Sequence, residues 1–90
     1  MLMRTYRVIV YGRVQGVGFR AFIYNLARNL DLKGSVKNML DGTVQIIIQG
    51  SENEIKRLIE LSYNGPSLSH VANIKIFEEE REAFSDFHIE

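Results

Sequence analysis

The 90-residue chain contains no cysteine, no tryptophan and a single proline. The lack of cysteine excludes disulfide bridges, thiolate zinc sites and a cysteine nucleophile, so hydrophobic packing must hold the fold together. Eleven Lys and Arg residues balance eleven Asp and Glu residues. This balance is unlike the large positive excess that is typical of a general nucleic-acid-binding protein.

Long hydrophobic runs are also missing. No apolar stretch approaches the roughly 20 residues that a membrane-spanning helix needs, and the first ten residues lack the pattern of a signal peptide. Hydrophobic side chains make up 46% of the sequence, which is enough for one compact core but not for two. We therefore expect a single domain over residues 1–90 that is soluble, cytoplasmic and monomeric, with no membrane or nucleic-acid partner.

The first half of the chain changes its periodicity once. Residues 5–11 alternate with a period of two and are rich in β-branched and aromatic types, which predicts a strand. From Phe19 onward, apolar residues recur at spacings of three and four, which predicts an amphipathic helix with one buried stripe that Gly34 could end. The stripe consists of Phe19, Phe22, Ile23, Leu26, Ala27 and Leu30.

The second half of the chain contains a predicted hairpin, a second helix and further strands. Residues 35–38 and 44–48 flank Asp41-Gly42, which predicts a β-hairpin. Ser51 with Glu54 three residues later predicts the capped start of a second helix, which Asn64-Gly65-Pro66 ends. Further strands are expected at 72–76 and 87–89. The order is that of a ferredoxin-like βαββαβ sandwich, an α+β fold with two helices on one face of a four- to five-stranded antiparallel sheet.

The stretch from Gly12 to Arg20 carries three glycines, and four interpretations compete for it. The simplest is a strand-to-helix turn that needs positive φ angles. A dinucleotide-binding fingerprint is the second, because Gly16, Gly18 and Ala21 fit G-x-G-x-x-A with Asp41 about 20 residues later. However, Asp41 follows a strand too closely for a crossover connection and is better suited to the hairpin turn.

The other two interpretations are binding sites. The order of elements is shared with RNA-recognition modules, but residues 43–49 contain no aromatic ring on which a base could stack. The fourth interpretation is an anion site, in which glycine-loop amides, the first turn of a helix and Arg20 converge on one oxyanion. In this arrangement the glycines allow the amides to point inward.

Two segments together resemble a known family. The stretches VYGRVQGVGFR, from Val10 to Arg20, and GSVKNMLDGTVQIIIQG, from Gly34 to Gly50, closely resemble the two signature segments of the acylphosphatases. Chain length and element order agree with that family from end to end. The resemblance implies a small ferredoxin-like enzyme that hydrolyses acyl phosphates, small-molecule substrates, to a carboxylate and inorganic phosphate without metal or cofactor.

The resemblance also implies roles for individual residues. Arg20 would bind the substrate phosphate, and Asn38 would position the attacking water. The main-chain amides of the loop complete the expected phosphate site, which consists of Gln15, Gly16, Val17, Gly18, Phe19 and Arg20. We expect no metal site, because His70 and His88 lie far apart and neither has a nearby ligand pattern.

Three points stay open from the sequence. Ser35 stands where the family usually has an aromatic residue, which affects packing or the substrate-side surface near the site. The final strand could bring the C-terminal carboxylate of Glu90 to the sheet edge that carries Asn38, where it would pair with a basic residue. A non-catalytic module that binds anions or phosphoproteins is the main alternative to an enzyme, with an RNA-binding domain a distant third.

Overall fold

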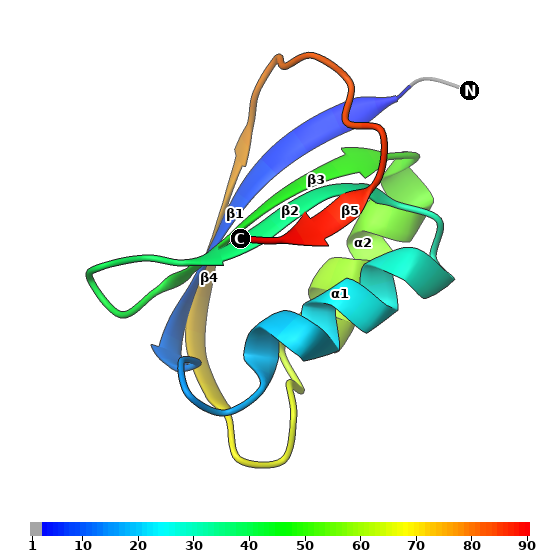
Figure 1. Ribbon diagram of the computed structural model, residues 1–90. Helices are drawn as coiled ribbons and strands as arrows, with labels where there is room; N and C mark the ends of the chain where they lie inside the picture. The colour runs from blue at the N-terminus through cyan, green and yellow to red at the C-terminus, as the bar shows by residue number, and fades with distance from the viewer. Residues whose placement is uncertain (1–2) are drawn as a thin grey trace.

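The computed structural model describes residues 3–90 and arranges them as a five-stranded sheet with two helices on one of its faces (Figure 1). This architecture confirms the expected βαββαβ order with a short additional strand. The elements are β1 (Arg4–Arg13), α1 (Phe19–Asn29), β2 (Lys33–Asn38), β3 (Val44–Gly50), α2 (Glu52–Ser62), β4 (His70–Glu78) and β5 (Phe87–Ile89).

The strands lie in the order β4-β1-β3-β2-β5. The pairs β1–β3, β1–β4 and β2–β3 are antiparallel, as expected, whereas β5 runs parallel to β2 with Val36 opposite Ile89. Parallel strands require a long connection, and the chain between β2 and β5 contains β3, α2 and β4. Residues 79–86 complete it by passing from β4 at one edge of the sheet to β5 at the other (Figure 1). The end of the chain thereby comes to lie beside the strand that ends at Asn38.

The core lies between the sheet and the helices. Val8 and Val10 on β1 are completely buried and face the helices together with the alternate residues of β3. The predicted stripe of α1 is confirmed, because Phe19, Ile23 and Ala27 are buried in the same core and the other members pack against it. Side chains alternate along a strand, so the even-numbered residues of β2 also face the helices.

The end of α1 differs from the prediction. The helix ends at Asn29, and Asp31 adopts a left-handed conformation with φ of 56°. Asp31 N–H donates to the carbonyl of Arg28 and Leu32 N–H donates to the carbonyl of Ala27, which is the Schellman pattern. Because Asp can adopt this conformation, no glycine is needed there.

Gly34, predicted as the helix stop, instead lies inside β2. A side chain at this position would collide with the main-chain oxygen of Ile47 on the neighbouring strand. The glycine is therefore required by the close approach of two strands.

The start of α2 agrees with the prediction in position but not in its contacts. Ser51 occupies the N-cap position, yet its side chain makes no capping hydrogen bond. Glu52 and Glu54 in the first turn interact favourably with the positive end of the helix dipole instead. No helix within residues 3–90 combines the length and the apolar character needed to span a membrane.

Candidate functional site

The loop between β1 and α1 forms one wall of the site. Gly16 and Gly18 have φ angles of 73° and 81°, in the left-handed region that other residues rarely adopt. Gly18 is also the N-cap of α1. The two glycines thus turn the chain sharply and lead it directly into the first turn of the helix.

The main-chain amides of this loop are free. None of the N–H groups of residues 15–20 donates a hydrogen bond to another group within residues 3–90. Consecutive free amides at the N-terminus of a helix, together with its dipole, form a favourable environment for an anion. The loop therefore has the donor arrangement that the anion-site interpretation requires.

Arg20 supplies the positive charge. It lies in the first turn of α1, and its Nη1 donates a hydrogen bond of 2.9 Å to the main-chain oxygen of Glu90. A guanidinium has five N–H donors in a planar fork. The contact with Glu90 fixes the direction of the side chain and leaves further donors for a ligand.

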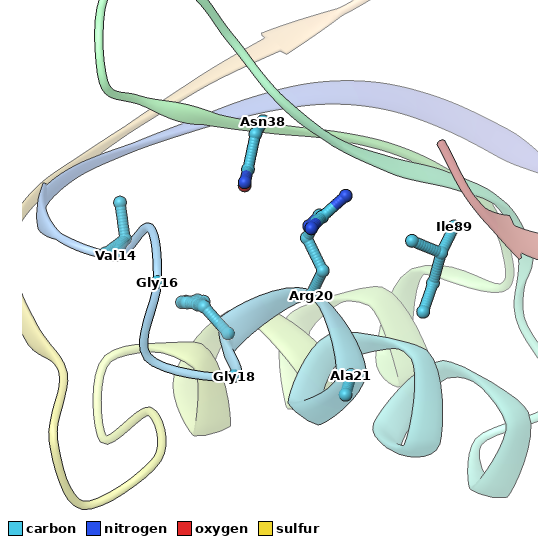
Figure 2. Close-up of a pocket in the computed structure, with 8 residues that line it drawn as sticks. Val14, Gly16, Gly18, Arg20, Ala21, Asn38 and Ile89 are labelled. Atoms are coloured by element: carbon cyan, nitrogen blue, oxygen red, sulfur yellow. The ribbon is translucent and has the colours of Figure 1, made fainter.

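Asn38 faces Arg20 from the sheet. It is the last residue of β2 and follows Val36 on the face that carries the helices. Its Oδ1 is buried and has no hydrogen-bond partner among the described residues. Figure 2 shows Asn38 and Arg20 extending toward the same space from opposite walls. A buried acceptor without a partner costs about 1–3 kcal/mol, so this atom is a candidate for a ligand contact.

These residues enclose a pocket of about 210 Å³. Five of the residues predicted for the site line it, whereas Gln15 and Val17 do not. The lining consists of Val14, Gly16, Gly18, Phe19, Arg20, Ala21, Asn38 and Ile89 (Figure 2). The sequence-based interpretation missed Val14, Ala21 and Ile89. The glycine motif gave a local signal for Val14 and Ala21, which flank its glycines. For Ile89 the signal was the expectation that the final strand reaches the sheet edge that carries Asn38.

Gln15 has a different arrangement from the rest of the loop. Its side-chain Nε2 donates hydrogen bonds to the main-chain oxygens of Met39 and Thr43, at 2.7 and 2.9 Å. The amide group of the side chain is thus committed to the β2–β3 hairpin. A contribution of Gln15 to phosphate binding would come from its main-chain N–H.

The expectation for Glu90 is confirmed in position and refined in its contacts. Glu90 N–H donates to the carbonyl of Val36 on β2, which brings the residue to the strand carrying Asn38. The basic partner is Arg20, and the atom it contacts is the main-chain oxygen. The side-chain carboxylate lies 3.1 Å from Nε2 of His88 instead.

Ser35 lies away from the pocket. It is 5% exposed and pairs with Ile47 on β3 and with His88 on β5. By the alternation of β2, its side chain is on the opposite face of the sheet from that of Asn38. The departure from the family pattern at this position therefore affects packing on the far face.

Asp41 serves the hairpin turn and not a ligand. Its carboxylate accepts hydrogen bonds from the main-chain N–H and the hydroxyl of Thr43, at 3.0 and 2.6 Å. These bonds hold the pKa of the Asp41 carboxyl below its ordinary value. The turn interpretation of Asp41 is confirmed, which removes the acid that a dinucleotide-binding site would need.

No group of three or more potential ligands gathers at a metal-binding distance within residues 3–90. His88 lies between two carboxylates, with Asp86 3.5 Å from Nδ1 and Glu90 3.1 Å from Nε2. The cluster of Asp86, His88 and Glu90 lies on and beside β5, and its residues do not line the pocket.

The chain shows extensive similarity to known acylphosphatases. The sequence profile of the family described as Acylphosphatase matches residues 6–89. An acylphosphatase of Methanocella arvoryzae is 41% identical over 87 residues, which span 97% of this chain and 99% of that protein. An acylphosphatase of Bacillus subtilis is 46% identical over 76 residues, or 84% of each chain.

The structural similarity agrees with the sequence similarity. A crystal structure of acylphosphatase from Bacillus subtilis superimposes with a TM-score of 0.93 at 42% identity and covers 98% of both chains. Agreement at this level over the whole chain includes both the glycine loop and the hairpin that carries Asn38. The chain therefore belongs to the acylphosphatase family.

Proposed function

We propose that this protein hydrolyses acyl phosphates to a carboxylate and inorganic phosphate without a metal ion. The observation that carries the proposal is the buried, unpartnered Oδ1 of Asn38, a residue that lines the same pocket as the glycine loop and Arg20. The family membership supports the reaction class. The arrangement of a water acceptor opposite an anion site supports hydrolysis over simple binding.

The phosphate group is held by two sets of donors. The free amides of residues 15–20 surround its oxygens, and the Arg20 guanidinium forms charge-assisted hydrogen bonds with them. Phosphoryl transfer leaves little covalent work to the protein, and catalysis rests on positioning and on stabilising charge at the equatorial oxygens. Arg20 and the amides supply that charge, so the chemistry does not require a metal ion.

Asn38 orients the attacking water. Its Oδ1 accepts a hydrogen bond from the water, and its NH2 group donates to a phosphate oxygen. The water oxygen forms a bond to phosphorus as the bond between phosphorus and the acyl oxygen breaks, and the electron pair leaves with the carboxylate. The conjugate acid of this leaving group has a pKa of about 4, so no general acid is needed at neutral pH. The proton of the water passes to the phosphate.

The proposal is tested by the hydrolysis of benzoyl phosphate with and without a chelator. We expect turnover that the chelator does not change. Replacement of Arg20 by alanine should lower kcat/KM by about 100-fold or more, the cost of losing an oxyanion contact. Arg28→Ala is the matched control, because Arg28 lies in the last turn of the same helix and contacts Tyr24.

Three outcomes would contradict the proposal. Turnover that the chelator abolishes would indicate a metal-dependent enzyme. Tight binding of inorganic phosphate without measurable hydrolysis would indicate a non-catalytic anion-binding module. A folded Arg20→Ala variant with the activity of Arg28→Ala would show that Arg20 does not hold the substrate phosphate.

A further inference from the structure

The glycine loop is attached to the rest of the molecule through one polar side chain. Gln15 Nε2 donates both of its hydrogens to the β2–β3 hairpin, to the carbonyl of Met39 at 2.7 Å and to that of Thr43 at 2.9 Å. The partners lie 24 and 28 residues further along the chain. This amide group therefore links the two walls of the pocket directly.

Gln15 contacts the two residues that join the strands of the hairpin to its turn. Met39 and Thr43 face each other there, because Met39 N–H donates to the carbonyl of Thr43 at 2.9 Å. The carbonyl of Met39 also accepts the N–H of Gly42 at 3.2 Å, which closes the turn. Met39 is the residue after Asn38, so Gln15 holds the segment from which the Asn38 side chain extends.

This form of attachment has a chemical advantage. A loop usually docks through its main chain, which would consume the N–H groups that the phosphate needs. Here the N–H groups of residues 15–20 remain without partners within the described part of the chain. Val14, which is 1% exposed, adds an apolar contact that uses no donor. The loop is thus fixed in place while its amides stay available.

We propose that Gln15 is a positioning residue that sets the distance between the bound phosphate and the water held by Asn38. This inference rests on the proposed function, because it assigns Gln15 a role through Asn38. The loop amides and Arg20 lie on the loop and α1, whereas Asn38, which orients the water and adds one donor to the phosphate, lies on β2 (Figure 2). Moving one wall relative to the other changes the approach of water to phosphorus. It leaves the phosphate contacts of the loop amides and Arg20 intact.

The test is a split between turnover and phosphate binding in two variants. Gln15→Glu keeps the shape of the side chain but has no N–H donor, and Gln15→Met removes the donor without adding charge. We expect both to lower kcat by about tenfold or more, since a misplacement of about 1 Å can cost on the order of 100-fold. In Gln15→Met, which adds no charge, the inhibition constant of inorganic phosphate should change by less than about threefold, because the loop amides and Arg20 hold the phosphate and move as one unit.

Gln45→Glu and Gln45→Met serve as matched controls. Gln45 lies half-buried on the neighbouring strand β3 and does not line the pocket. We expect both control variants to keep the wild-type kcat and the wild-type phosphate inhibition constant. Cooperative thermal unfolding of each variant shows that it is folded.

A second measurement tests the link to Asn38 directly. If Gln15 acts through Asn38, Gln15→Met should cost less than about twofold in kcat when Asn38 is already alanine, because coupled residues are not additive. A full tenfold loss in the Asn38→Ala background would overturn the inference. So would a folded Gln15→Met variant with wild-type kcat, or one whose phosphate inhibition constant rises as much as its kcat falls.

The same series separates this inference from the proposed function. An inactive Asn38→Ala variant beside a fully active Gln15→Met variant overturns the role of Gln15 alone. An Asn38→Ala variant with wild-type turnover overturns the role of Asn38, and with it the link that Gln15 is proposed to maintain.

Discussion

Two turns near the pocket contain a glycine in the left-handed conformation, and they use their hydrogen bonds in opposite ways. The hairpin turn at Asp41-Gly42 is closed on itself, because Asp41 accepts two hydrogen bonds from Thr43 and Gly42 N–H donates to Met39. The glycine loop at residues 14–18 leaves its amides without partners within the described residues. The first turn uses these groups within the turn itself, and the second leaves its amides beside the pocket.

This contrast shows what a glycine in a sequence can and cannot indicate. Gly18 and Gly42 have similar φ angles of 81° and 92°, and neither has an atom within 4 Å of the position that a side chain would occupy. Both are needed for the same local reason. The difference in function comes from where the neighbouring donors and acceptors find partners.

The largest expected effect compares two residues of the hairpin. Asn38→Ala should lower kcat/KM for benzoyl phosphate by about 100-fold or more, because the acceptor that orients the water is lost. Asp41→Asn should change it by less than about threefold, since Asn still offers an oxygen to Thr43. Steady-state kinetics on both folded variants checks this, and equal activity in the two would remove Asn38 from the mechanism.

The next largest effect, a loss of about tenfold in kcat/KM, is expected from one of two matched glycine replacements. Gly18→Ala and Gly42→Ala should each lower the free energy of unfolding by about 1–2 kcal/mol, the cost of a left-handed conformation for a residue with a side chain. Gly18→Ala should also lower kcat/KM by about tenfold, because relief of the strain reorients the loop amides. Gly42→Ala should leave kcat/KM unchanged.

Chemical denaturation and steady-state kinetics on the same samples measure both quantities. Similar losses of activity in the two variants would mean that the glycine loop has no special part in binding the phosphate.

The smallest expected effect concerns the stability of the hairpin turn. The pKa of Asp41 is lowered in the folded state by the hydrogen bonds from Thr43. Its carboxylate therefore stabilises the fold fully above the unfolded pKa of about 3.9, and this contribution is lost as the pH falls through the lower folded pKa. Wild type should be more stable than Asp41→Asn at pH 6, and the difference should shrink as the pH falls below the unfolded carboxyl pKa of about 3.9.

Denaturant unfolding of both proteins checks this. The pH is varied from about 2.5 to about 7, a range that brackets the ordinary carboxyl pKa of about 4. A difference that stays constant over the whole range would show that the carboxylate is not involved.

Features encoded by neighbouring residues could be predicted from the sequence. The start of α1 at Phe19, the hairpin turn at Asp41-Gly42 and the last strand at 87–89 follow from local periodicity and turn chemistry. The approach of Arg20 and Asn38 to one pocket followed from the family resemblance. The geometry places both residues in the lining of that pocket.

Features that depend on contacts between distant segments could not be predicted. The position of Gly34 after the apolar stripe of α1 suggests a helix stop, although the close approach of β3 is what requires this glycine. The Gln15 contacts with Met39 and Thr43 join residues that no short motif relates. Ile89 reaches the pocket because β5 pairs in parallel with β2, which the pattern of a three-residue strand does not specify.

The most direct test of the phosphate site is a titration with inorganic phosphate followed by amide NMR spectra. We predict that the largest chemical-shift changes fall on the main-chain amides of residues 15–20 and on the side-chain amide of Asn38. The amides of Gly42 and Thr43 in the closed hairpin turn should change little, and chloride at the same ionic strength should have no comparable effect. Changes centred on another surface, or none in residues 15–20, would contradict the account.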